Sequence, residues 1–223
     1  MDSKELDGLL RDIQELKRSV RKANPFLRDI FAIRAYAILS LPLGVLLLAD
    51  CMAAHFLTKA AGSFGAIDAA WRTLIIGILI AIAVVGSVMK WIIIGRKAAQ
   101  IKSGANFGSV VAAVYGGHWF NLSAPLVICM IVTSVFTVAA GHFWLISPVI
   151  AIWMGPFCCI ISVLLDRKEY VPGGWYMTAT GLVGLFLTEG APFLWLAIVW
   201  AGALLVFGIA GLSATKPGRE ENL

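Results

Sequence analysis

The stretch TLIIGILIAIAVVGSVMKWIII, residues 73–94, decides the class of fold, because Lys90 is its one charged residue. A helix that crosses the roughly 30 Å hydrocarbon core of a bilayer needs about 20 mostly apolar residues. Residues 73–94 satisfy this requirement, and Lys90 lies close enough to the end of the stretch for its ammonium group to reach the headgroup region. The stretch therefore predicts a transmembrane helix.

Five further stretches have the same apolar character, although residues 173–188 are shorter than the others: residues 33–55, 121–140, 144–165, 173–188 and 192–213. The chain as a whole is 60% hydrophobic and 14% charged, whereas soluble domains carry about 25% charged residues. The sequence predicts an all-α, polytopic membrane protein with six transmembrane helices. It divides into an N-terminal cytoplasmic helix (1–24), a transmembrane domain (25–213) and a short cytoplasmic tail (214–223).

The distribution of basic residues predicts the orientation of these helices. Cytoplasmic loops of membrane proteins are enriched in Lys and Arg. Every Lys and Arg except Lys59 and Arg72 falls on the segments that six crossings would place on one side. We therefore expect both termini in the cytoplasm and residence in the cell (inner or plasma) membrane. The sequence has no basic cluster on a segment outside the membrane, so we expect no nucleic-acid binding.

The first 24 residues have the pattern of a short coiled coil. Apolar residues alternate at spacings of three and four, which is a heptad seam with β-branched residues at two a positions and leucine at d: Leu6, Leu9, Ile13, Leu16 and Val20. This seam predicts a homo-oligomer. Two other interpretations stay open: a helix lying on the anionic lipid of the inner leaflet, and a helix docked on the protein's own loops.

A second assembly signal lies between the second and third predicted spans. Small residues recur every fourth position, at Gly104, Gly108, Ala112 and Gly116. Such a stripe lets another backbone approach closely, so it indicates helix packing. It also permits a re-entrant or pore-lining segment.

Few side chains suggest chemistry. Arg34, Asp50, Lys90 and Asp166 are expected at span ends, so the membrane interior is predicted to lack buried ionisable groups, which argues against a proton-coupled transporter. The candidate polar sites all lie on the outer side: Glu189 between the fifth and sixth spans, and His55 and His142, which could together ligate a haem.

Motifs typical of hydrolases, nucleotide sites and metal centres are missing from the sequence. We therefore expect a non-enzymatic membrane protein without a cofactor that acts by assembly, with itself or with a partner subunit. A channel or facilitator lined by residues 104–117 is the alternative, and a haem subunit is a weaker one.

Overall fold

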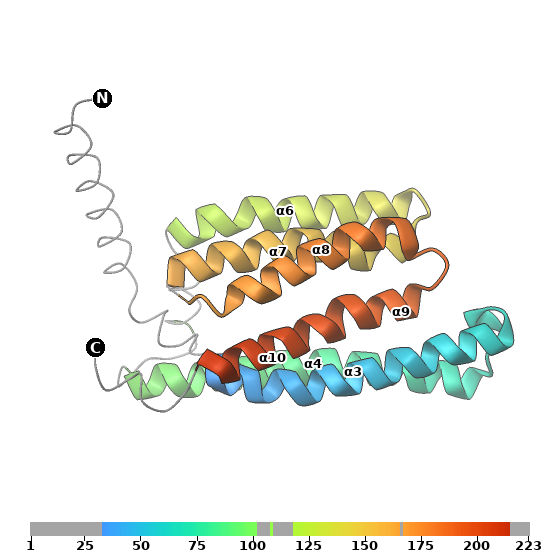
Figure 1. Ribbon diagram of the computed structural model, residues 1–223, viewed down its shortest axis with the longest axis horizontal. Helices are drawn as coiled ribbons and strands as arrows, with labels where there is room; N and C mark the ends of the chain where they lie inside the picture. The colour runs from blue at the N-terminus through green and yellow to red at the C-terminus, as the bar shows by residue number, and fades with distance from the viewer. Residues whose placement is uncertain (1–32, 102–107, 109–117, 166, 215–223) are drawn as a thin grey trace, which may run out of the picture.

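The computed structural model describes residues 33–101, 108, 118–165 and 167–214, and these form helices only. The main helices are α3 (Ile33–Ala61), α4 (Ala69–Ile101), α6 (His118–Ala139), α7 (Ile146–Leu165) and α8 (Tyr170–Leu187) (Figure 1). The last helical stretch consists of α9 (Pro192–Leu196), the π-helical turn η3 (Ala197–Ala201) and α10 (Gly202–Ala214). Short 3₁₀ turns, η1 (Phe64–Ala66) and η2 (Phe143–Leu145), follow α3 and α6.

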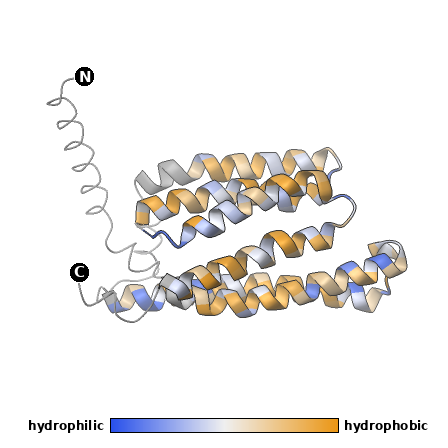
Figure 2. Cartoon of the chain, in the orientation of Figure 1, coloured by the Kyte–Doolittle hydropathy of each residue, from blue (hydrophilic) through white to orange (hydrophobic). Residues whose placement is uncertain are grey.

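Four helical stretches are long and apolar enough to cross a membrane: Tyr36–Ala61, Ala69–Gln100, Phe143–Val163 and Pro192–Ser213. Apolar residues run along most of their length, and polar residues gather toward the ends of α3 and α4 (Figure 2). The expectation of six spans is thus met for four. The apolar part of α6, Ala124–Ala139, is too short to count as a membrane-crossing stretch, and α8 is not among the four stretches that are long and apolar enough.

Local signals explain where the helices begin and end. Gly62 directly follows α3 and Gly141 follows α6 by two residues, and both adopt a positive φ of 81°, a conformation that glycine reaches without strain. The Asp68 carboxylate accepts a hydrogen bond of 2.8 Å from the Ala70 N–H and so caps the start of α4. Both α3 and α4 extend well past residues 55 and 94, where the apolar pattern alone had placed their ends.

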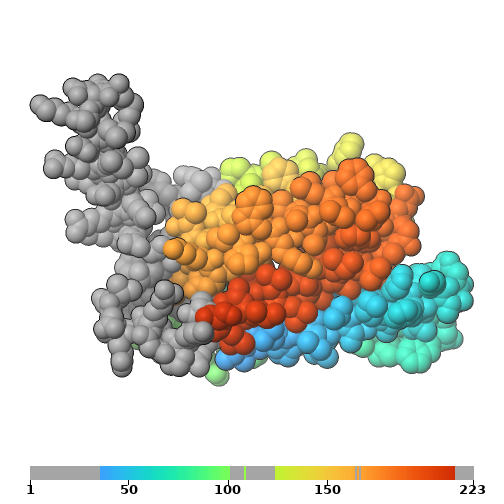
Figure 3. All heavy atoms as spheres, in the orientation of Figure 1, coloured from blue at the N-terminus to red at the C-terminus, as the bar shows by residue number. Residues whose placement is uncertain are grey.

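The helices form two layers, one of α6, α7 and α8 and the other of α3, α4 and the last helical stretch (Figure 1). Helix α10 packs against both α3 and α8, which joins the layers. The space-filling view shows α10 between these two helices (Figure 3).

Glycine residues let α7 and α8 approach each other. A Cβ atom on Gly155 of α7 would lie 2.6 Å from the Gly174 carbonyl oxygen of α8, and one on Gly181 would lie 2.9 Å from the Pro148 carbonyl oxygen. These separations leave no room for a side chain. The contact is the small-residue packing typical of membrane helices.

The π-helical turn is held by a side chain from the other layer. The Tyr176 hydroxyl group donates a hydrogen bond of 2.6 Å to the Ile198 carbonyl oxygen, which lies inside η3. Gly202 gives the tyrosine ring its space, because a Cβ there would collide with it. The wider turn therefore has a specific partner for one of its displaced carbonyl groups.

Candidate functional site

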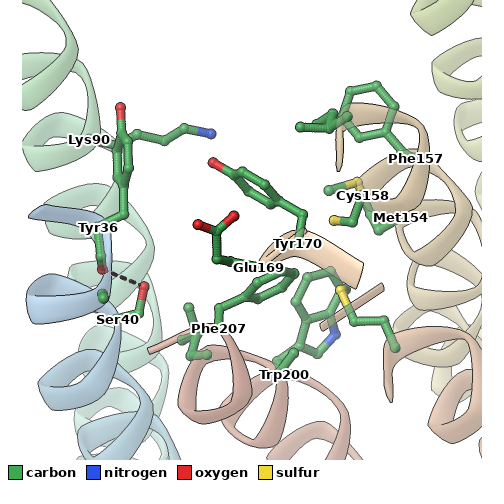
Figure 4. Close-up of a pocket in the computed structure, with 15 residues that line it drawn as sticks. Tyr36, Ser40, Lys90, Met154, Phe157, Cys158, Glu169, Tyr170, Trp200 and Phe207 are labelled. Carbon is green, nitrogen blue, oxygen red and sulfur yellow. Dashed lines mark hydrogen bonds between the residues drawn. The ribbon is translucent and has the colours of Figure 1, made fainter. Parts of the chain in front are cut away.

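A cavity of about 310 Å³ lies where the two layers meet. Its walls come from α3, α4, α7, the first turn of α8, η3 and α10, so residues far apart in the sequence face one space (Figure 4). The volume falls at the lower end of the range for small-molecule sites, roughly 300–1,000 Å³. We describe it as the candidate functional site.

One end of the cavity is polar. Lys90 of α4, Tyr36 of α3, and Glu169 and Tyr170 at the start of α8 extend their polar groups toward this end (Figure 4). The Tyr36 hydroxyl group and the Glu169 Oε2 atom are buried without a hydrogen-bond partner. Buried polar atoms are nearly always paired, so this end of the cavity is incomplete with the described protein atoms alone.

Helix boundaries place these side chains. Tyr36 lies in the first turns of α3, where its backbone carbonyl accepts a hydrogen bond of 2.7 Å from the Ser40 hydroxyl group. Glu169 is the residue before α8, and Tyr170 is the first residue of that helix. The chain reversal from α7 to α8 therefore presents the carboxylate and the phenol beside each other.

Lys90 does not occupy the position that the sequence predicted for it. Helix α4 continues to Ile101, so Lys90 lies within the helix rather than at its end. Its side chain lines the cavity between the layers. The helix continues through the basic residues after Ile94. The expectation that the ammonium group reaches the headgroup region stays a prediction.

The rest of the cavity is apolar and aromatic. Met154, Met177, Trp200, Leu204 and Phe207 line it. The Trp200 indole N–H donates a hydrogen bond of 3.0 Å to the Ser147 hydroxyl group, which fixes the indole in place. The rings of Tyr170 and Phe207 meet nearly edge to face, with their centroids 6.0 Å apart. The cavity thus has a polar end and an apolar body.

Asp50 also departs from expectation. It lies well inside Tyr36–Ala61, is 7% exposed, and its Oδ2 atom has no hydrogen-bond partner. The sequence placed it at a span end because the apolar pattern stopped near residue 55. Asp50 contradicts the expectation that the spans lack buried ionisable groups, and this removes the premise of the argument against proton coupling. Lys90 lines the cavity but is exposed.

Among the described residues, no hydrogen bond, ion pair or ring contact joins the predicted polar residues Glu189, His55 and His142. Glu189 is exposed in the turn after α8. The His55 ring is tilted against the Phe56 ring and the His142 ring meets Trp144 edge to face, with centroid separations of 5.6 and 5.1 Å. Among the residues that the structure describes, no group of three or more His, Cys, Asp or Glu could hold a metal ion.

Two other predicted sets lie mostly outside the described residues. The described part of the chain does not include the heptad residues Leu6, Leu9, Ile13, Leu16 and Val20. It also does not include Gly104, Ala112 and Gly116 of the small-residue stripe. Gly108 is described and is exposed. Neither the coiled coil nor the small-residue stripe is tested by the structure.

The sequence reasoning did not single out Tyr36, Glu169 or Tyr170. One signal was available: Glu169 and Tyr170 precede Pro172 and two glycines, a pattern that places a carboxylate at a helix start. Only the packing of the two helical layers shows that Lys90 and Tyr36 line the same cavity as Glu169. Comparisons with family models, curated proteins and solved structures found no match to this chain.

Proposed function

We propose that the chain is a non-enzymatic, multi-pass protein of the cell membrane that binds a small solute in the cavity between its helical layers. The observation that carries the proposal is the polar end of the cavity, where an ammonium group, a carboxylate and two phenols line one space and two buried atoms lack partners. Such convergence of polar groups in an apolar pocket is typical of ligand sites. A facilitator is the class of protein that this arrangement fits best.

Six crossings with both termini in the cytoplasm form part of the proposal. Helices α6 and α8 each pack along α7, which is one of the four stretches apolar enough to span. Arg167 and Lys168 precede α8, and Arg96 and Lys97 lie near the end of α4. By the positive-inside rule these residues face the cytoplasm, which puts the polar end of the cavity on the cytoplasmic side.

Native cysteines provide the test of the cavity. Cys158 lines it and is 6% exposed, whereas Cys51 is 0% exposed and lies in the packing of α3 against η3. In purified full-length protein with one cysteine retained, we expect a small water-soluble maleimide to modify Cys158 at least tenfold faster than Cys51, since the rate follows access of the reagent to the thiol. Equal rates would contradict a solute-accessible cavity.

Assembly is the second candidate function, and α4 favours it. Only 6% of the best membrane window of α4 is buried within the chain, and many of its large apolar side chains are exposed, among them Ile76, Ile80, Val84 and Val88. Lipid or another subunit covers such a surface in a membrane. The heptad seam in residues 1–24 supplies a reason for the second subunit to be another copy of the chain.

Deleting residues 1–24 tests assembly. We expect the intact chain to have the mass of an oligomer in mild detergent, because membrane tethering lets a short seam suffice. The deleted chain should approach the mass of a single copy, which is below the 24.0 kDa of one full-length chain. Mass photometry or light scattering with correction for detergent measures the change. Replacing Leu9 and Leu16 by lysine provides a matched full-length variant, and a monomeric intact chain would contradict this candidate.

A further inference from the structure

We propose that the cavity binds a zwitterionic amphiphile, a molecule with an anionic group and a primary ammonium group a few atoms apart on an apolar body. This inference rests on the proposed solute-binding function and adds the class of solute. It follows from the juxtaposition of Lys90 and Glu169 at one end of an otherwise apolar cavity (Figure 4).

Lys90 and Glu169 bring two opposite charges to the polar end of the cavity. Lys90 and Glu169 come from α4 and from the start of α8, and between these two described residues the structure records no ion pair within 4.0 Å. Lys90 is exposed and Glu169 is half-buried. A ligand that fills the cavity removes both charges from water, and each then needs an opposite charge and hydrogen bonds. A ligand that carries both charges supplies a partner to each side chain at once. A simple anion would leave Glu169 without a partner, and a simple cation would leave Lys90 without one.

Tyr36 and Tyr170 bring two phenol groups to the same end of the cavity. The Tyr36 hydroxyl group is buried and has no partner, and the Tyr170 hydroxyl group extends toward the same space as the Lys90 ammonium group (Figure 4). A phenol donates a hydrogen bond readily to an anionic oxygen. Both tyrosines therefore favour the anionic group of the ligand beside Lys90. The ligand's ammonium group would then face the unpaired Glu169 Oε2 atom.

The remaining walls of the cavity are apolar. Met154, Met177, Trp200, Leu204 and Phe207 surround the remainder of the cavity. Methionine side chains adapt to irregular apolar shapes, and about 310 Å³ accommodates a short aliphatic body rather than two full acyl chains. A ligand that was polar throughout would gain nothing from these walls.

Two sources could supply this chemistry. One is the headgroup region of an aminophospholipid from the cytoplasmic leaflet, with one chain entering the cavity. The other is a free apolar amino acid from the cytoplasm. Both present an anionic group and an ammonium group to the same side chains.

The test uses the purified full-length chain and its tryptophan fluorescence, because Trp200 lines the cavity. The probes are lysophosphatidylethanolamine, lysophosphatidylglycerol with the same acyl chain, and L-leucine. We expect lysophosphatidylethanolamine to bind on the order of tenfold more tightly than lysophosphatidylglycerol, the effect of one charge-assisted hydrogen bond. Leucine binding with the same dependence on the two charged residues would assign the ligand to the free amino acid instead.

Variants distinguish the two charges. Glu169→Gln should abolish the preference for lysophosphatidylethanolamine, and Lys90→Met should weaken both lysolipids about tenfold or more. Tyr170→Phe should weaken both less than Lys90→Met, and it keeps the test open should Lys90→Met not fold. Glu189→Gln and Lys168→Met are the matched controls, because both residues are exposed and lie outside the cavity lining. They should bind as the wild type does.

Equal binding of both lysolipids, unchanged in Glu169→Gln, would overturn the zwitterion proposal while leaving a solute-binding cavity in place. Failure of both lysophosphatidylethanolamine and leucine to bind would also overturn it. The proposed function itself fails separately, when the Cys158 thiol reacts no faster than the Cys51 thiol.

Discussion

Gly155→Ala should destabilise the protein by about 1–3 kcal/mol, the range for overpacking a tight core. The added methyl group would lie 2.6 Å from the Gly174 carbonyl oxygen, and it would also meet Thr178, whose hydroxyl group donates a hydrogen bond of 3.0 Å to that same carbonyl. The Gly174 carbonyl oxygen cannot retreat without moving the backbone of α8. Because α8 supplies Glu169 and Tyr170 at the cavity, ligand binding should fall together with stability.

The control for this prediction is Gly77→Ala. Gly77 is an exposed residue of α4, and a Cβ added there meets nothing within 4 Å. The same chemical change should therefore be neutral or stabilising by up to about 1 kcal/mol, the difference in helix propensity between glycine and alanine. Unfolding in mixed micelles with increasing SDS measures both variants. Equal stability of the two variants would contradict the close packing of α7 on α8.

Asp50→Asn should stabilise the protein by about 1–3 kcal/mol at pH 8, the size of the free energy attached to one poorly satisfied buried polar group. The Asp50 carboxylate is 7% exposed and its Oδ2 atom has no partner. Asparagine has nearly the same shape and carries no charge. The stabilising direction separates Asp50 from most core positions, where substitutions lower stability.

Glu189→Gln is the matched comparison for Asp50→Asn, because Glu189 is exposed in a turn. Removing its charge should leave the unfolding midpoint within about 0.5 kcal/mol of the wild type, as for most surface changes. A loss of stability in Asp50→Asn would show that the carboxylate makes a stabilising interaction in the folded protein and would contradict its description as an unpaired group.

The apolar runs predicted the existence of the helices well, since α3, α4, α6, α7, α8 and the α9–α10 stretch each overlap one of the predicted spans over most of its length. Their lengths were less predictable. Hydropathy detects where a helix stops being apolar, whereas the helix itself ends where a cap or a left-handed glycine stops it, as Gly62 does after α3. Lys90 and Asp50 were misplaced for this reason.

The candidate site was far less predictable than the helices. Glu169 and Tyr170 read as ordinary loop residues, and their meaning depends on α8 packing beside α10 and on Lys90 facing them from α4. Hydropathy contains no information on which face of one helix meets another. His55 and His142 were singled out for their residue type, which suggested ligation. In the structure each ring packs against a neighbouring aromatic side chain.

The central claim is a solute-binding cavity whose polar end faces the cytoplasm. It is tested most directly by sided modification of Cys158 in sealed vesicles, with Cys158 as the one cysteine retained and a membrane-impermeant maleimide as the reagent. We predict modification in inside-out vesicles, protection there by lysophosphatidylethanolamine, and no modification in right-side-out vesicles. Modification from the outer side alone, or from neither side, would contradict this account.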